Sequence, residues 1–416
     1  MFEALWSGRL PMEDWTKFVA GGALTPVSEA VATVHATYFC GSVTAVRTSD
    51  GLVLIDTGGA AQAQQIIDAI GSWDAAPVHT IVYTQGHIDH TSGAMLIDAE
   101  ADRLGRPRPR VIAHENVPAR FDRYKLTNGF NSVVQGNQFN QPDYRYPSSF
   151  RYPDVVYADT LQFTVGGVDF ELHHRRGETD DATFVWMPQE KALATGDFVI
   201  WACPNAGNPR KVQRYAAEWA ATLRFMQGLN PAALIPGHGP VVFGEERIQQ
   251  ILGDTASALE DMITQTVALM NEGRTLNEVL HAVRRPRELD KPYLIPTYDD
   301  PEFIVRGCWH LYGGWFDGNP SHLKPAKDDV VAREIAELAG GAGALAARAA
   351  ALSASGDTRS AVHLVEMASL ASPLDKSIQH VRADVYRACV ASETSLIGKN
   401  LFAVYLRDAE RRGTAK

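Results

Sequence analysis

The stretch TQGHIDHTSGA, residues 84–94, places two histidines and an aspartate within four positions. It follows HTIVYT (79–84), a β-branched run that predicts a strand. Loops after the carboxyl ends of strands present ligands in α/β folds, and imidazole nitrogens and carboxylate oxygens bind Zn²⁺. His87, Asp89 and His90 are therefore candidate metal ligands. Gln85 stands where a further histidine would complete H-x-H-x-D-H, so three interpretations remain: a two-metal site with one weak ligand, a site that has lost a metal, or no site.

Composition narrows the class of protein. The chain has 416 residues, enough for two or three domains, and a net charge of -10 with no basic stripe, which argues against a nucleic-acid partner. Four cysteines lack the paired spacing of a disulfide framework. No signal-peptide pattern is seen, and no apolar run approaches the ~20 residues that cross a bilayer. We therefore expect a cytoplasmic protein without a membrane partner.

Residues 43–239 alternate β-rich runs with helical stretches, which predicts mixed sheets covered by helices. The pattern is helical from about 244 to 283, and almost wholly helical from about 328 to 412. Within the last part, GDTRSAVHLVEMASLASP (356–373) resembles half of a tetratricopeptide helix pair, but one unit makes no array. We expect a small helical bundle that serves packing or assembly.

The stretch from Thr127 to Pro153 is rich in aromatic residues, Asn, Gln and Pro, and shows no clear periodicity. It is predicted to be a long loop, and loops of that length are usually functional or disordered. Its aromatic residues argue against disorder. It forms either a wall of the active site or a patch buried between subunits.

Five motifs in order extend the first observation. They are LVLIDTGG (52–59), TQGHIDH (84–90), GETDDATFVW (177–186), ALATGD (192–197) and LIPGHGP (234–240). Together they resemble the metallo-β-lactamase superfamily over about residues 30–250. That resemblance implies an α/β fold, the αββα sandwich, with a two-metal site along one edge.

Further residues resemble one particular branch of this superfamily. Glu178 stands where most of the superfamily has a histidine, as is typical of the alkylsulfatase branch, and Asp197 follows 19 residues later as the expected bridging carboxylate. Asn205 and Arg210 fall at that branch's offsets for holding a sulfate group. YGGWFDGNPSHLKP (312–325) resembles the branch's GW-[FY]-DGNP-x-HL signature. The expected organisation is a catalytic domain over 1–255 and an all-α, mostly helical dimerisation domain over 256–416, forming a homodimer.

The resemblance also implies the ligands. Metal 1 would be bound by His87 and Glu178, with Gln85 at the remaining position; metal 2 by Asp89, His90 and His238; and Asp197 would bridge. Asp56 resembles the aspartate that orients the metal loop. Zn²⁺ is expected at both sites, although the oxygen-rich site 1 would hold it weakly and favours harder ions such as Mn²⁺, Mg²⁺ or Fe²⁺.

The expected function is metal-dependent hydrolysis of a small anionic ester, most similar to alkyl sulfate cleavage by a metal-activated water. Asp89, Asp197, Asn205 and Arg210 are the expected catalytic residues. Two alternatives stay open. One is hydrolysis of another ester, a lactone or a β-lactam on the same fold, because fold does not fix substrate. The other is a binding protein whose metal site is impaired by Gln85.

Overall fold

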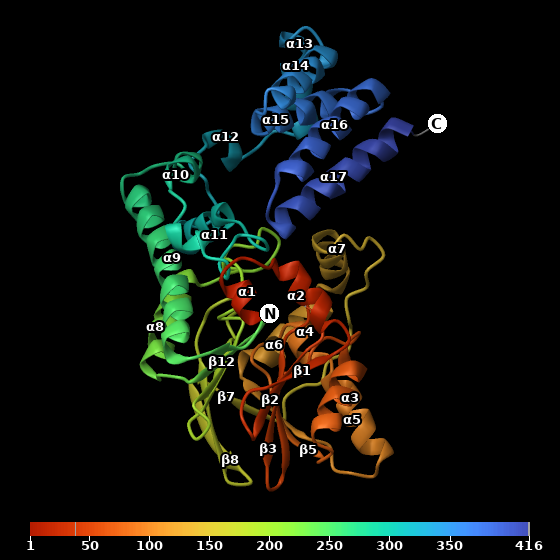
Figure 1. Cartoon of the computed structure of the whole chain (residues 1–416). Coiled ribbons are helices and arrows are strands. Elements are labelled where there is room, and N and C mark those ends of the chain that lie inside the picture. Colours follow the sequence, from red (N-terminus) through yellow and green to blue (C-terminus); the bar gives the residue numbers. More distant parts are fainter. Residues whose placement is uncertain (38, 415–416) are drawn as a thin grey trace.

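The computed structural model describes residues 1–37 and 39–414, and shows two stacked sheets with helices outside them and a helical region at one end (Figure 1). Within these residues the first sheet has the order β1 (Ala23–Pro26), β2 (Val31–His35), β3 (Val43–Thr48), β4 (Gly51–Ile55), β5 (Val78–Val82), β6 (Arg110–His114) and β7 (Val155–Tyr157). The second has the order β13 (Val242–Phe243), β12 (Ala233–Pro236), β11 (Ala192–Gly196), β10 (Thr183–Met187), β9 (Val168–His174) and β8 (Thr160–Val165). Both sheets mix parallel and antiparallel pairs.

The helices fall into two groups. Those of the sandwich are α1 (Phe2–Trp6), α2 (Met12–Val19), α3 (Ala63–Trp73), α4 (Ile88–Thr91), α5 (Ala94–Arg103), α6 (Asn116–Leu126), α7 (Asn128–Gln138), α8 (Ala216–Gly228) and α9 (Glu245–Asn271). Those that follow are α10 (Leu276–Ala282), η1 (Arg287–Asp290), α11 (Pro301–Gly313), α12 (Pro320–Leu323), α13 (Asp328–Leu338), α14 (Ala342–Ala354), α15 (Thr358–Ala371), α16 (Lys376–Ser392) and α17 (Leu396–Thr414).

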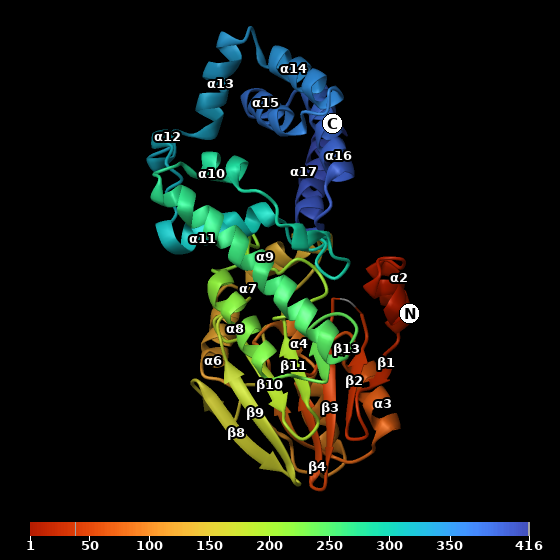
Figure 2. The same cartoon turned by 60° about the vertical axis from the view of Figure 1, so that its left-hand side comes forward.

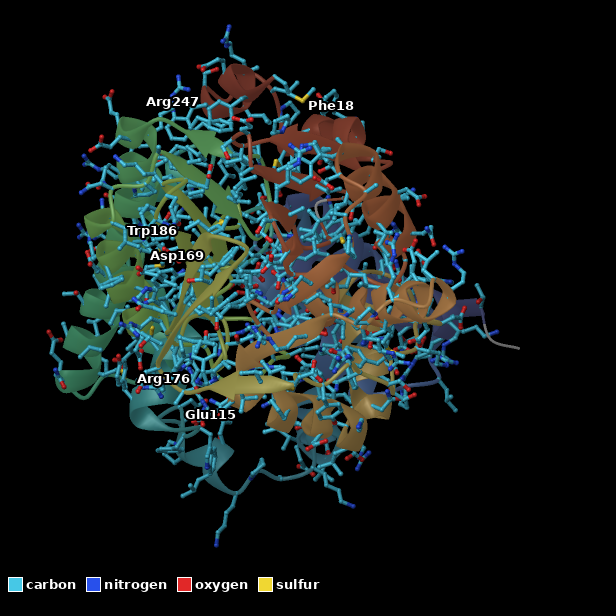
Figure 3. The ribbon with its side chains drawn as sticks, turned by 90° about the horizontal axis from the view of Figure 1, so that it is seen from below. Phe18, Glu115, Asp169, Arg176, Trp186 and Arg247 are labelled. Atoms are coloured by element: carbon cyan, nitrogen blue, oxygen red, sulfur yellow. The ribbon has the colours of Figure 1, made fainter. Side chains whose placement is uncertain are left out.

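Alternating side chains along the strands explain the layers. In β4, Leu54 packs toward the helices outside the first sheet, whereas Val53 faces the second sheet. In β10, Val185 faces the first sheet, whereas Trp186 lies in the core beneath α8 and α9. Trp186 is labelled in Figure 3. Successive strand residues point to opposite faces, so each sheet buries both of its faces. The predicted αββα sandwich is confirmed.

The predicted strands between 43 and 239 are present, but the structure adds β1, β2, β7 and β13. The prediction of a loop over residues 127–153 is wrong in its first part, because α7 occupies Asn128–Gln138. Asn128 donates from Nδ2 to the carbonyl of Tyr146 at 2.9 Å. A Cβ on Gly136 would lie 2.6 Å from the carbonyl oxygen of Gln141. Tertiary contacts of this kind override weak local propensity.

The helical region stands on the sandwich at the end where α7 lies, and α17 descends toward α7 (Figures 1 and 2). The expected domain boundary at residue 255 falls inside α9, whose residues Ile248 and Met262 share one core with Trp219 of α8. In the described chain no single helix is long and apolar enough to cross a bilayer, although α13 and α14, bent by 87°, meet that test as a pair.

Candidate metal centre

Four loops at strand ends bring the predicted ligands together. Asp197 directly follows β11, and His238 follows β12 by two residues. Glu178 lies in the turn between β9 and β10, and Gln85 and His87 lie in the loop that leads from β5 into α4, which carries Asp89 and His90. The approach of two of these loops requires glycine, because a Cβ on Gly237 would lie 2.1 Å from Oδ1 of Asp197. The edge of the sandwich therefore gathers residues that are far apart in sequence.

Asp89, His90 and His238 form one group with metal-ligand geometry. Nε2 of His238 lies 3.4 Å from Oδ2 of Asp89, and Nε2 of His90 lies 3.6 Å from the same oxygen. Donors about 2.0–2.2 Å from a tetrahedral ion are separated by about 3.3–3.6 Å. The spacing therefore fits one divalent ion.

Asp197 completes this first group. Its Oδ1 lies 3.3 Å from Nε2 of His90 and 3.4 Å from Nε2 of His238. Among the described residues, Oδ1 of Asp197 and Nε2 of His90 are buried but make no hydrogen bond. Buried polar atoms normally have a partner, and a shared cation would supply it. These two atoms are therefore positioned where the ion expected at site 2 could bind.

Asp56 orients the ring of His90. Its Oδ2 lies 2.8 Å from Nδ1 of His90, and its two oxygens accept hydrogen bonds from the backbone N–H and hydroxyl of Thr84 at 2.7 and 2.6 Å. A carboxylate only accepts, so Nδ1 carries a proton, and in the neutral ring Nε2 has the lone pair that a metal needs. Asp56 adopts a positive φ of 62° to reach this position. The role expected of Asp56 from the sequence matches this geometry.

His87, Glu178 and Asp197 form the second group of candidate metal ligands. Nδ1 of His87 lies 3.4 Å from Oε2 of Glu178. Gln85 differs from a metal-binding histidine here, because its Nε2 donates to Oδ2 of Asp197 at 2.6 Å and to Oε2 of Glu178 at 3.2 Å. Its Oε1 accepts from the hydroxyl of Thr179 at 3.1 Å. Oδ2 of Asp197 and Oε2 of Glu178 thus already accept hydrogen bonds in this group, whereas Oδ1 of Asp197 and Nε2 of His90 in the other group make none within the described residues.

Glu178 has two further polar partners, Asn205, which the resemblance placed at the sulfate group, and Arg214, which no motif identified. Nη1 of Arg214 lies 2.9 Å from its Oε1, and the side-chain amide of Asn205 donates to the same oxygen. Burial alone would raise the pKa of Glu178, but the Arg214 guanidinium and His87 outweigh burial and hold that pKa well below its ordinary value. Glu178 is therefore an anion at neutral pH.

A cavity of about 490 Å³ opens onto both groups. Residues 135–147 contribute to its wall, as one of the two interpretations of the 127–153 stretch expected. Lys211 and Arg214 line it, as does Arg145 near the surface, but Arg210 is not among the described residues that do. Nζ of Lys211 donates to Oε1 of Gln135 at 2.9 Å. No motif in the sequence distinguished Lys211 from its neighbour Arg210 as the residue that faces the cavity.

Two family profiles match the chain. Residues 39–238 match the metallo-beta-lactamase superfamily, and residues 275–412 match the alkyl sulfatase dimerisation region. The two matches lie on the sandwich and on the helices that follow it. The resemblance seen in the motifs is confirmed.

Individual relatives agree with the profiles. A linear primary-alkylsulfatase from Pseudomonas sp. is 24% identical over 88% of this chain and 73% of its own length. An (R)-specific secondary-alkylsulfatase from Pseudomonas sp. is 28% identical, and the match spans 87% of this chain but 58% of the relative. The solved stereoselective inverting sec-alkylsulfatase from Pseudomonas sp. superposes with a TM-score of 0.83 at 25% identity, over 95% of this chain and 66% of that chain.

Proposed function

The chain belongs to the metallo-β-lactamase superfamily, in its alkylsulfatase-like branch, and we propose that it is a metal-dependent hydrolase of alkyl sulfate esters. The observation that carries the proposal is a cavity onto which two metal-ligand groups open and which a cation and aromatic side chains line. Phe39 and Phe139 pack edge to face in that lining, with centroids 5.5 Å apart. An anionic head and an apolar tail are the two features such a cavity would recognise.

We propose Zn²⁺ as the metal, with up to two ions per chain and the weaker affinity at His87, Glu178 and Asp197. When bound, such ions lower the pKa of water and polarise an ester oxygen. The residues of the chain supply the rest: Asp56 fixes the tautomer of His90, and Arg214 holds Glu178 in place. Gln85 donates to both carboxylates of the weaker group, so a metal there would have to displace its N–H.

The anionic head needs a positive partner. The resemblance assigns that role to Arg210 with Asn205, but Lys211 is the neighbouring cation that lines the cavity. The bond to Gln135 uses one of the three ammonium N–H groups of Lys211 and leaves two for a ligand. The guanidinium group of Arg214, by contrast, already forms an ion pair with Glu178. We propose that Lys211 contacts the sulfate oxygens.

A panel of esters tests the function. Protein purified without chelator and supplied with Zn²⁺ is assayed against medium-chain alkyl sulfates, the matching phosphates, a lactone and a β-lactam. Release of inorganic sulfate from the alkyl sulfates, at rates well above those for the other classes, is expected. Preferential hydrolysis of a lactone or phosphate would assign another ester, and no turnover by fully metal-loaded protein would favour a binding protein.

We also propose that the chain forms a homodimer through its helical region, on the basis of the match to the dimerisation profile. Large apolar side chains on these helices and on the loops between them are exposed in the single chain, among them Trp315, Leu338 and Leu374. Exposed apolar surface of this kind commonly marks an interface.

A further inference from the structure

Gln138, at the end of α7, joins three parts of the chain. Its side chain is buried, donating from Nε2 to the hydroxyl of Tyr298 at 2.8 Å and accepting at Oε1 from Nδ2 of Asn208 at 3.2 Å. Its backbone carbonyl accepts from Nδ2 of Asn400, on α17, at 2.7 Å. One side-chain amide and one carbonyl thus connect the cavity wall, the loop after β11 and the last helix of the dimerisation region.

The connected residues shape the part of the cavity that surrounds Lys211. Gln135 lies one turn before Gln138 on α7 and accepts the hydrogen bond from Lys211. Asn208 lies three residues before Lys211, and its Oδ1 accepts from the backbone N–H of Arg210 at 3.1 Å. A shift of α7 would therefore move the ammonium group of Lys211 both directly and through its loop.

A second set of contacts ties the same loop to α17. The backbone N–H groups of Leu396 and Ile397, at the start of α17, donate to the carbonyls of Thr297 and Tyr298 at 2.9 and 3.3 Å. The next residue, Asp299, is buried and accepts from the N–H of Gly207 at 3.0 Å. Gly207 has no room for a side chain, because a Cβ would lie 1.9 Å from the backbone of Phe303. The loop that carries Lys211 is thus fixed against the segment on which α17 begins.

We infer that α17 sets the shape of the substrate cavity through Gln138, and that Gln138 and Asn400 are positioning residues for the anionic head of the substrate. Figures 1 and 2 show α17 reaching from the helical bundle to the end of the sandwich where α7 lies. The dimerisation region therefore has a role beyond assembly. The effect on substrate rests on the proposed function, whereas the effect on α7 does not.

Asn400→Ala tests the inference, with the exposed neighbour Lys399→Ala as the matched control. Loss of this hydrogen bond is expected to raise KM for an alkyl sulfate about 5-fold, while kcat and the metal content change by less than about 2-fold. Hydrogen exchange is expected to speed up in peptides covering 128–141 and 203–211. Tyr298→Phe, which removes one oxygen, should produce the same pattern and guards against misfolding of the first variant.

The outcomes are separable. Unchanged exchange in both peptides and unchanged KM in Asn400→Ala and Tyr298→Phe would overturn the inference. The same KM increase in Lys399→Ala would also overturn it, because the effect would then belong to α17 in general. If the parent protein hydrolyses no sulfate ester, the proposed function fails, but faster exchange confined to the Asn400 and Tyr298 variants would still support the inference.

Discussion

Nε2 of Gln85 lies 2.6 Å from Oδ2 of Asp197, so the carboxylate shared by the two candidate metal sites accepts a hydrogen bond on one side. Its other oxygen, Oδ1, faces His90 and His238 and has no hydrogen-bond partner in the described structure. The two carboxylate oxygens of Asp197 therefore differ in whether they already accept a hydrogen bond. A cation adds a missing partner at metal 2, whereas at metal 1 it must compete with an amide N–H.

Gln85→His is expected to increase metal affinity at site 1 by at least about 10-fold, since even outer-shell partners change metal affinity about 10–100-fold. Imidazole is a stronger donor to Zn²⁺ than an amide, and the carboxylates would lose their competing N–H. Elemental analysis after dialysis against limiting chelator measures the retained metal. Gln62→His, which adds a histidine elsewhere in the cavity lining, is the control. Two tightly held ions in the parent protein, together with no gain of metal affinity in Gln85→His, would refute the weak metal binding assigned to site 1.

Asp197→Ala and His238→Ala should differ in how much metal they lose. Asp197 belongs to both groups, so its removal is expected to reduce both ions, whereas His238→Ala should reduce only metal 2. Metal affinity falls when a ligand is lost. His281→Ala, on the exposed helix α10, should retain the parental content. Parental metal content in both site variants would show that the ion lies elsewhere.

Lys211→Met should reduce kcat/KM for alkyl sulfates about 10- to 150-fold, the cost of a lost hydrogen bond to a charged group at roughly 1.5–3 kcal/mol. Arg210→Met should change it less than about 3-fold, because Arg210 does not line the cavity. Steady-state kinetics with matched metal loading distinguishes the two. The opposite ranking would return the anion-binding role to Arg210.

The affinity for an anionic ester should depend on pH through Lys211. Burial and the neighbouring Arg214 lower the pKa of Lys211 from 10.5 to about 8. The ammonium form predominates below that pKa, so KM is expected to rise as the pH increases through about 8. In Lys211→Arg this rise should disappear, because arginine stays protonated. A parental KM that is constant from about pH 7 to 9.5 would contradict this assignment.

Replacing Trp315, Leu338 and Leu374 together with serine should shift the protein from dimer to monomer in sedimentation velocity. These side chains are 66%, 90% and 92% exposed in the single chain, and their burial between subunits would stabilise a dimer by the hydrophobic effect. Phe18→Ser, a similarly exposed residue outside the dimerisation region, is the control. A parent that sediments as a monomer, or a triple variant that stays dimeric, would exclude this interface.

Sequence reasoning identified the features that depend on local order. Short β-rich runs predicted β4 and β10, and the resemblance of Asp56 to the superfamily's structural aspartate predicted its contact with the metal loop. Sequence reasoning failed where contacts between residues far apart in the sequence determine the local structure. The helix α7 depends on contacts such as that of Asn128 with Tyr146. The path of the 203–211 loop depends on Asp299 and on the close packing of Gly207. Fixed offsets along the chain therefore pointed to Arg210, whereas the folded loop brings Lys211 to the cavity.

The release of inorganic sulfate from a medium-chain alkyl sulfate, measured while Zn²⁺ is titrated into metal-depleted protein, tests the central proposal most directly. Sulfate release is expected to increase as metal binds, to be lost on chelation, and to be absent from Asp197→Ala at every metal concentration. Metal binding to the parent protein without any sulfate release, or equal release by Asp197→Ala, would contradict the proposal that these residues form a metal-dependent sulfate ester hydrolase.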